Sequence, residues 1–162
     1  MNIKIYTTGG TFDKVYFDAK SEFKIGDPII PDLFKEANVT FDFEVESILK
    51  KDSLDMTEAD RDLIYDHIAH SGAGRILLTH GTDTMVATAQ RLSDITDKTI
   101  VMFGSMEPAR MRYSDAMYNL GVASAAVQLL PHGIYVAMNG QIFDPQKVRK
   151  NRGAARFELV DS

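Results

Sequence analysis

Five short apolar segments alternate along this chain with longer segments of helical periodicity. Most of the apolar segments are continuous rather than strictly alternating, which is typical of strands covered on both faces of a sheet. Strands that alternate with helices predict an α/β sandwich with a mainly parallel central sheet. The predicted strands are Ile3–Thr7, Thr40–Leu49, Arg75–His80, Thr99–Phe103 and Gly133–Met138.

The second predicted strand differs from the others in its pattern. In Thr40–Leu49 the apolar residues Phe41, Phe43 and Val45 alternate with acidic residues. Such alternation indicates one buried and one solvated face. We therefore expect this strand at an edge of the sheet or half exposed.

Helices are predicted between the strands. Thr57 and Asp60 have the spacing of a capping box, and the helix they open is expected to stop near Gly72, with a positive φ at that glycine. A second helix is expected over Asp83–Asp94. A third is expected over Ser114–Leu130, ended by Pro131 and buried on more than one side, since small residues crowd it.

The remaining segments carry weaker patterns. A short helix is expected around Asp32–Ala37. Beyond Asn139 the sequence predicts a hairpin-like stretch over 141–143, a turn at Asp144-Pro145 and then a basic tail. No internal repeat or linker divides the chain, so residues 1–162 are expected to form one domain.

Composition narrows the classes of partner and compartment. The chain has 162 residues, a formal charge of −5 and no Cys. The acidic balance argues against nucleic acid and anionic membranes as partners. No apolar run approaches the roughly 20 residues that span a bilayer, and no secretory leader precedes the first strand. We expect a cytoplasmic protein without disulfides or thiolate chemistry.

The residues that follow each strand are the candidate chemistry, because ligands of parallel α/β sheets bind beyond the carboxyl ends of the strands. The first strand runs into Thr8-Gly9-Gly10-Thr11, where two glycines allow close approach of a ligand to the backbone. Thr11 is either a nucleophile on this turn or a solvated residue of an ordinary tight turn. The sequence alone leaves both readings open.

The third strand runs into His80-Gly81-Thr82-Asp83-Thr84, directly before a predicted helix. Thr82 or Asp83 is either the N-cap of that helix or part of a functional site, and the two roles are compatible. Two further exits carry hydroxyls, at Ser53 and at Gly104-Ser105. A helix cap or loop also explains Ser53, and at Gly104-Ser105 an ordinary loop start is the stronger interpretation.

Other functional motifs are missing from the sequence. It contains no phosphate-binding loop, no dinucleotide-binding glycine pattern and no Gly-x-Ser-x-Gly elbow. His67 and His70 are three residues apart on a predicted helix, but no third ligand accompanies them. We therefore expect neither a metal nor a cofactor.

Taken together in register, these motifs resemble the bacterial-type L-asparaginase family. The resemblance rests on the loops around Thr11, Ser53 and Thr82 described above. It continues through Gly104-Ser105-Met106, Ser114-Asp115, Asn119-Leu120 and Val136–Gly140 to Val148-Arg149-Lys150. It covers residues 1 to about 158 and only the family's larger, N-terminal domain. It implies a three-layer, Rossmann-like fold.

The resemblance also implies hydrolysis of a small side-chain amide through a threonine ester. Thr11 is then similar to the family's nucleophile, and Thr82, Asp83 and Lys150 to its second catalytic cluster. Ser53 and Asp83 match groups that hold the substrate's carboxylate and ammonium groups, and Gly10, Gly81 and Ser105 are further expected contacts. The family's loop tyrosine corresponds to Phe23 by straight alignment or to Tyr16 by function, and we favour Tyr16.

Two departures from the family pattern concern the substrate. A glutamine of the family is Leu54 here, and the sequence stops at Ser162, so we expect no second domain. A homo-oligomer is then expected to close the site around a small amide or amino acid. The alternatives are a non-catalytic amino-acid-binding domain and a subunit that requires a separately encoded second domain.

Overall fold

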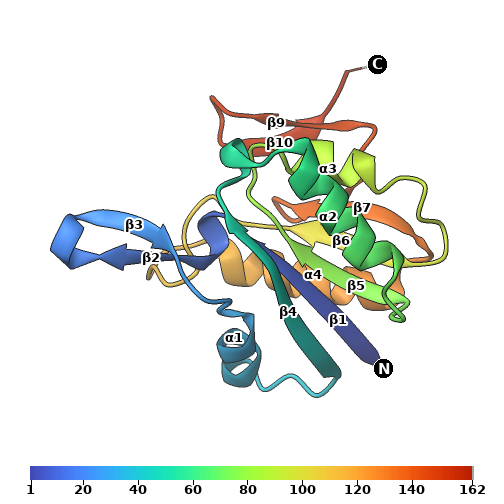
Figure 1. The fold of residues 1–162 in the computed structure, drawn as a ribbon, viewed down its shortest axis with the longest axis horizontal. Helices are drawn as coiled ribbons and strands as arrows, with labels where there is room; N and C mark the ends of the chain where they lie inside the picture. Colours follow the sequence, from blue (N-terminus) through green and yellow to red (C-terminus); the bar gives the residue numbers. More distant parts are fainter. Residues whose placement is uncertain (162) are drawn as a thin grey trace.

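A computed structural model describes residues 1–161 and contains three layers, with helices on both faces of a central sheet (Figure 1). The strands are β1 (Asn2–Gly9), β2 (Lys14–Phe17), β3 (Glu22–Ile25), β4 (Asp42–Lys51), β5 (Arg75–Thr79), β6 (Thr99–Phe103), β7 (Gly133–Met138), β8 (Gln141–Phe143), β9 (Val148–Asn151) and β10 (Arg156–Leu159). The helices are α1 (Ile30–Glu36), α2 (Glu58–Ala69), α3 (Met85–Arg91) and α4 (Ala116–Leu129), with 3-10 helices η1 (Thr11–Asp13), η2 (Asp18–Lys20) and η3 (Ser53–Asp55).

The central sheet has six strands in the order β4-β1-β5-β6-β7-β8. The first five run parallel, and β8 pairs antiparallel with β7 through a tight turn. Asn139 and Gly140 of that turn have φ values of 53° and 73°. Two adjacent residues with positive φ match the right-handed twist of a hairpin. The predicted mainly parallel sheet is confirmed.

Alternate residues of each strand enter two separate cores. Tyr6 and Leu78 pack beneath α2 and α3, whereas Ile5 and Leu77 pack beneath α1 and α4. The buried strands β5 and β6 are apolar on both faces for this reason. The predicted three-layer, Rossmann-like architecture is confirmed.

The predicted edge strand also lies where its pattern placed it. β4 pairs only with β1 within the sheet and forms one edge. Phe43 and Val45 pack against the core, while Asp42 and Glu44 are exposed. The alternation of Thr40–Leu49 was therefore a correct indicator of a half-exposed strand.

Two details of the helix predictions are wrong. α2 ends at Ala69, close to the predicted end near Gly72, but Gly72 has no positive φ. α4 has one exposed stripe, since its surface residues Tyr118 and Leu129 are 65% and 82% exposed. The many small residues of α4 allow close packing on the sheet, but they do not bury the helix on more than one side.

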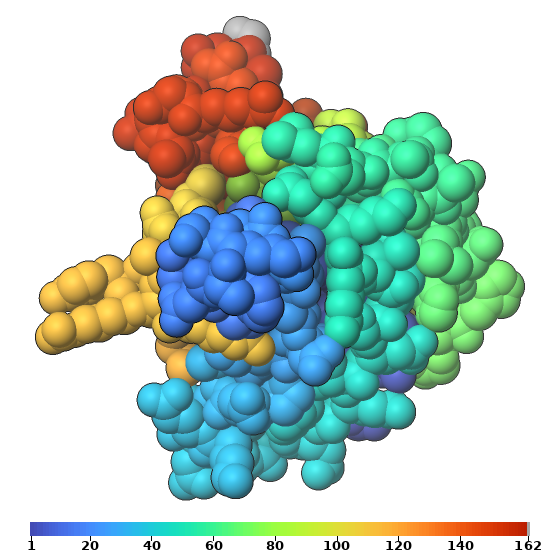
Figure 2. All heavy atoms as spheres, turned by 60° about the vertical axis from the view of Figure 1, so that its left-hand side comes forward, coloured from blue at the N-terminus to red at the C-terminus, as the bar shows by residue number. Residues whose placement is uncertain are grey.

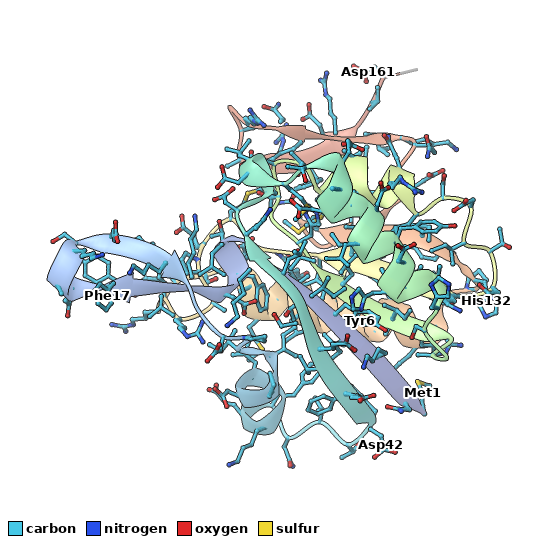
Figure 3. All side chains as sticks on the ribbon, in the orientation of Figure 1. Met1, Tyr6, Phe17, Asp42, His132 and Asp161 are labelled. Carbon is cyan, nitrogen blue, oxygen red and sulfur yellow. The ribbon has the colours of Figure 1, made fainter. Side chains whose placement is uncertain are left out.

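Two hairpins were not predicted as strands. β2 and β3 pair antiparallel and extend away from the sheet, with Phe17 near the tip (Figure 3). β9 and β10 form a second hairpin from the basic tail. Figure 2 looks onto the first hairpin, in blue, with the second, in red, above it.

Among residues 1–161, no helix is long and apolar enough to cross a membrane.

Candidate active site

The strand order reverses between β1 and β5, because the chain crosses from β1 to β4 on one side and then to β5 on the other. Ligands of doubly wound sheets bind at such a switch point, beyond the carboxyl ends of the strands. Thr11 follows β1 and Thr82 follows β5, so both lie at the switch point of this sheet.

The backbones of the two strand exits touch at a pair of glycines. A Cβ atom on Gly10 would lie 2.7 Å from both N and Cα of Gly81, and Gly10 has a φ of +79°. Only glycine fits this position without strain. Thr11 and Thr82 each follow the contact directly, one Cα step of about 3.8 Å away from it.

The exit of β4 joins the same contact. A Cβ atom on Gly81 would lie 2.6 Å from Cβ of Ser53. The Thr84 hydroxyl donates a 2.8 Å hydrogen bond to the Ser53 carbonyl, and the Thr84 N–H donates to the Ser53 hydroxyl at 3.4 Å. Ser53 is 1% exposed, and both its hydroxyl and its carbonyl are bonded to Thr84. Its contact with a substrate stays a prediction.

Lys150 reaches this edge of the sheet from β9. Its Nζ donates to Thr82 Oγ1 at 2.7 Å and to Asp83 Oδ1 at 2.8 Å. Arg152 Nε lies 3.1 Å from the same carboxylate oxygen. The Lys150 and Asp83 side chains are 14% and 25% exposed, so the pair is screened less than a surface ion pair. Three of the predicted catalytic residues thus meet in one bonded group.

The side chains of Thr82 and Asp83 are not helix caps. The N-cap of α3 is Thr84, and it makes no side-chain capping bond. The polar atoms of Thr82 and Asp83 are directed to Lys150 instead. Capping therefore does not account for this polar cluster.

Thr11 begins η1 and is partly buried. Its carbonyl accepts the N–H of Lys14, whose Nζ lies 3.3 Å from Asp52 Oδ2. Hydrogen bonds join Lys150 to Thr82 and Asp83. Thr11 lies next to that group because Gly10, the residue before it, contacts Gly81. The structure thus places Thr11 beside the cluster rather than within it.

The two candidates for the loop tyrosine position face one another. Tyr16 on β2 pairs directly with Phe23 on β3, and their ring centroids are 5.3 Å apart. Tyr16 is 51% exposed on the projecting hairpin. Its predicted support of Thr11 stays a prediction, as does substrate contact by Ser105, which is buried and donates to the Glu107 carbonyl at 2.6 Å.

The pKa values of two carboxylates near Thr11 are shifted in opposite directions. Burial raises the pKa of Asp13 to about 6, although a hydrogen bond from the Ile29 N–H acts against this rise. Burial also favours a higher pKa at Asp52, but hydrogen bonds from the Leu54 N–H and from Lys14 outweigh it and lower the pKa. Asp52 is therefore a stable negative charge beside Lys14.

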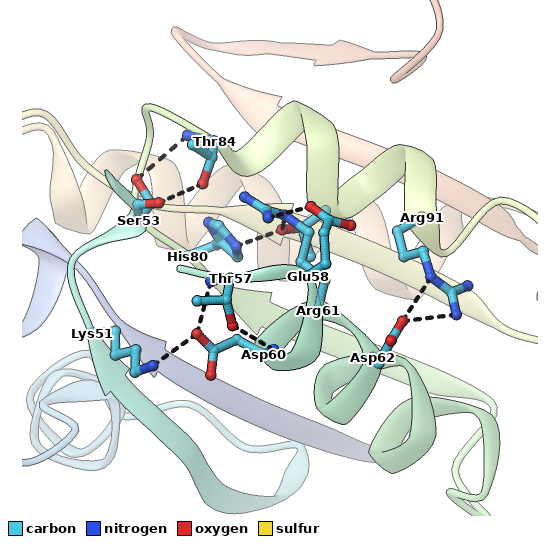
Figure 4. A network of polar contacts seen from close by, with 11 residues as sticks. Lys51, Ser53, Thr57, Glu58, Asp60, Arg61, Asp62, His80, Thr84 and Arg91 are labelled. Carbon is cyan, nitrogen blue, oxygen red and sulfur yellow. Dashed lines mark hydrogen bonds and ion pairs between the residues drawn. The ribbon is translucent and has the colours of Figure 1, made fainter. Parts of the chain in front are cut away.

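Sequence reasoning missed a buried polar chain beneath the turn. His80, Thr88 and Arg61 are connected by hydrogen bonds, and Arg61 is paired with Glu58 at 2.7 Å (Figure 4). The capping box of α2 and the Ser53–Thr84 bonds flank this chain in the same view. Arg152 was also missed, because nothing in the local sequence ties it to Asp83.

The two helical histidines have separate partners. His67 Nδ1 lies 3.2 Å from Glu46 Oε1, and His70 Nδ1 lies 2.8 Å from the Asp66 carbonyl oxygen. Within residues 1–161, no group of three or more His, Asp or Glu side chains is arranged to hold a metal ion.

Comparison with known proteins decides the family. Residues 2–160 match the family described as "Asparaginase, N-terminal". The chain belongs to the asparaginase family. Its similarity to the family thus covers nearly all of the sequence, as the register of the strand-exit motifs indicated.

Relatives with different names share this asparaginase domain. A glutaminase-asparaginase of Acinetobacter glutaminasificans is 31% identical over 167 residues, which cover 92% of this chain and 49% of that protein. One of the subunits of the glutamyl-tRNA(Gln) amidotransferase of Methanococcus vannielii is 32% identical over 182 residues, covering 99% of this chain and 42% of that protein.

Solved asparaginase structures share the fold. The thermostable L-asparaginase of Thermococcus kodakarensis superposes with a TM-score of 0.85 at 26% identity, over 100% of this chain and 52% of that one. L-asparaginase I of Vibrio cholerae gives 0.85 at 27% identity, over 98% and 51%. The chain spans about half the length of these relatives.

Proposed function

We propose that this protein hydrolyses a small, asparagine-like side-chain amide to a carboxylate and ammonia through an acyl ester on Thr11. The support is the bonded group of Thr82, Asp83 and Lys150 at the switch point, next to the Gly10–Gly81 contact. Membership of the asparaginase family and the names of its relatives agree with amide hydrolysis.

In the first step the Thr11 oxygen attacks the amide carbonyl carbon. A threonine hydroxyl is a weak nucleophile until a base accepts its proton. Lys150, hydrogen-bonded to Thr82, is the proposed acceptor or relay of that proton. Asp83 pairs with the ammonium form, so we assign it to positioning and charge matching.

The tetrahedral intermediate then collapses. The C–N bond breaks, and the proton taken from Thr11 leaves with the amine as ammonia, while the acyl group remains on Thr11. Backbone N–H groups of the turns that follow Gly10 and Gly81 are the proposed partners of the developing oxyanion, each worth about 3 kcal/mol in comparable sites, while the Gly10 N–H itself donates to the Lys51 carbonyl. Water cleaves the ester, which restores Thr11 and releases the carboxylate.

The substrate's ammonium and carboxylate are assigned to Asp83 and to the Ser53 loop. Asp83 Oδ1 already receives Lys150 and Arg152, so Oδ2 is the proposed partner of an ammonium group. Tyr16 is proposed to act on Thr11 when the β2–β3 hairpin bends toward the site. The mechanism uses only side chains, backbone and water.

Ammonia release from asparagine, glutamine and related small amides tests the proposal. We expect release by the wild type and at least a hundredfold lower rate for Thr11→Ala and Lys150→Met, because each removes a group used in bond making. Lys147→Met is the matched control, since Lys147 lies on the same segment and is 73% exposed.

The outcomes separate the alternatives. Binding of aspartate without turnover would favour an amino-acid-binding domain. Activity that requires an added second chain would favour a subunit role. The similarity to a subunit of an amidotransferase is the observation that favours this alternative. Undiminished ammonia release by Thr11→Ala would overturn the threonine ester mechanism.

We also propose that the protein forms a homo-oligomer that closes the site. An exposed apolar side chain at the carboxyl end of the sheet supports self-association there: Tyr113, in the loop after β6, is 78% exposed. Sedimentation velocity over a range of concentrations is expected to show a species larger than 18.1 kDa. An active monomer at every concentration would contradict this proposal.

A further inference from the structure

His80 connects the end of β5 to the Gly81–Asp83 turn and is buried. Both of its ring nitrogens have partners. Nδ1 lies 2.8 Å from the Gly81 carbonyl oxygen, and Nε2 lies 2.8 Å from Thr88 Oγ1. The ring therefore links the turn to α3, with no contact left over for a substrate.

The partners determine where the proton lies. The Gly81 carbonyl only accepts, so Nδ1 carries the hydrogen. Arg61 only donates, and its Nε–H is directed to Thr88 Oγ1 at 3.2 Å. The Thr88 hydroxyl is then free to donate to Nε2, which accepts. Each of these three hydrogen bonds thus has a defined donor and a defined acceptor, and the His80 ring is neutral.

The surroundings hold the ring neutral. Burial lowers the pKa of His80 to about 4, and the positive charge of Arg61 acts in the same direction. Glu58 balances that charge at 2.7 Å from Arg61. In a protonated ring Nε2 would donate instead of accept, so the Thr88 hydroxyl hydrogen would lose its acceptor.

The bond to Gly81 sets the backbone of the site. A peptide unit is planar, and none of the peptide bonds within residues 1–161 is cis. Fixing the Gly81 carbonyl therefore fixes the Thr82 N–H on the opposite side and holds in the same plane the Thr82 Cα, which carries the Thr82 side chain. That side chain is the one held by Lys150.

We propose that His80 is a positioning residue for the reaction, locked in its Nδ1–H form by Thr88 and Arg61 so that it orients the Gly81 carbonyl and Thr82. This inference deepens the proposed function and rests on it. It assigns to the buried hydrogen-bonded residues beneath the turn a role beyond stability, because His80 orients the residue that bonds to Lys150.

Thr88→Val and Thr88→Ser test the inference as a matched pair. Valine keeps the shape of threonine but does not donate to Nε2, whereas serine still does. We expect Thr88→Val to lower kcat at least tenfold with KM within about twofold, and Thr88→Ser to restore most of kcat. A folded Thr88→Val enzyme with wild-type kcat, or a serine variant no better than valine, would overturn it.

Nitrogen NMR of His80 provides a readout that does not depend on turnover. The wild type is expected to show protonated Nδ1 and unprotonated Nε2 at neutral pH, and Thr88→Val an Nε2 signal shifted by the loss of its hydrogen bond. A wild-type ring protonated at Nε2 would overturn the inference. If no amide is hydrolysed, the proposed function fails while this measurement still decides the positioning geometry.

Thr88→Val leaves the Arg61 Nε–H without its acceptor and could therefore destabilise the fold. A second pair of variants, at His80, tests the inference independently of Thr88. The amide of His80→Asn can still donate to the Gly81 carbonyl from the position of Nδ1, whereas His80→Leu cannot. We expect His80→Asn to retain at least tenfold more kcat than His80→Leu. Equal activity of the two variants would contradict a positioning role.

Discussion

Asp13 shows how a single residue couples pH to the segment that carries Thr11. It lies two residues after Thr11 and is 1% exposed, and its carboxylate accepts the Ile29 N–H at 3.0 Å. Its carbonyl accepts both the Gly26 N–H and Arg110. The residue thus fastens the base of the β2–β3 hairpin, and its ionisation occurs inside the protein.

Replacement of Asp13 by Asn is expected to change how stability depends on pH. The pKa of about 6 in the folded protein lies above the 3.8 of an ordinary Asp, so its favourable contribution exists below 3.8 and is lost as pH rises through 6. As the pH rises from about 5 to 8, the free energy of unfolding of Asp13→Asn should increase by roughly 1 kcal/mol relative to that of the wild type.

Urea denaturation of both proteins at the two pH values measures this difference. Because asparagine still accepts the Ile29 N–H, the variant keeps the bond that anchors the segment. A pH-independent difference between the two proteins would show that Asp13 titrates normally.

At the residue scale, sequence patterns identified Thr82, Asp83 and Lys150 as one group although 67 residues separate Asp83 from Lys150. The strand-exit rule singled out Thr82 and Asp83, and only the family resemblance added Lys150 to them. The bonds that join His80 to Thr88 and Arg61 were beyond reach, because they depend on how α2 packs against α3, and nothing in the local spacing encodes that packing.

At the scale of elements, the capping box of α2 is the local signal that the structure reproduces most fully. Thr57 Oγ1 accepts the Asp60 N–H at 3.2 Å, and Asp60 Oδ2 accepts the Thr57 N–H at 2.8 Å. Asp60 also pairs with Lys51 at the end of β4. The cap therefore joins the start of α2 to the strand beside the site.

Thr57→Ala is expected to destabilise the protein by about 1 kcal/mol, since the Asp60 N–H loses its acceptor. Thr57→Ser keeps the acceptor and should stay within about 0.5 kcal/mol of wild type. Thermal or urea unfolding measures both. An alanine variant as stable as the serine variant would mean that the cap contributes little.

The elements that were missed have physical reasons. β2 and β3 extend from the body, so their residues form no core that a sequence pattern would report. Glu22 to Ile25 do alternate between charged and apolar residues, which is a usable strand signal. β9 was not predicted because Arg149 and Lys150 break any apolar pattern, and only one of its residues, Val148, is buried in the core.

At the scale of the whole molecule, the strand order explains why the site lies where it does. The connections that leave β1 and β5 run to opposite sides of the switch point, and Gly10 contacts Gly81 there. The two unpredicted hairpins, β2–β3 and β9–β10, carry Tyr16 and Lys150. The layers follow from sequence periodicity, whereas these additions come from packing between distant segments.

Trapping of the acyl enzyme tests the central claim most directly. After rapid acid quenching with an amide substrate, mass spectrometry of proteolytic peptides is predicted to find the acyl group on the peptide containing Thr11. The same peptide should stay unmodified in Thr11→Ala. An acyl group on Thr82, or ammonia release without any acylated threonine, would contradict the account.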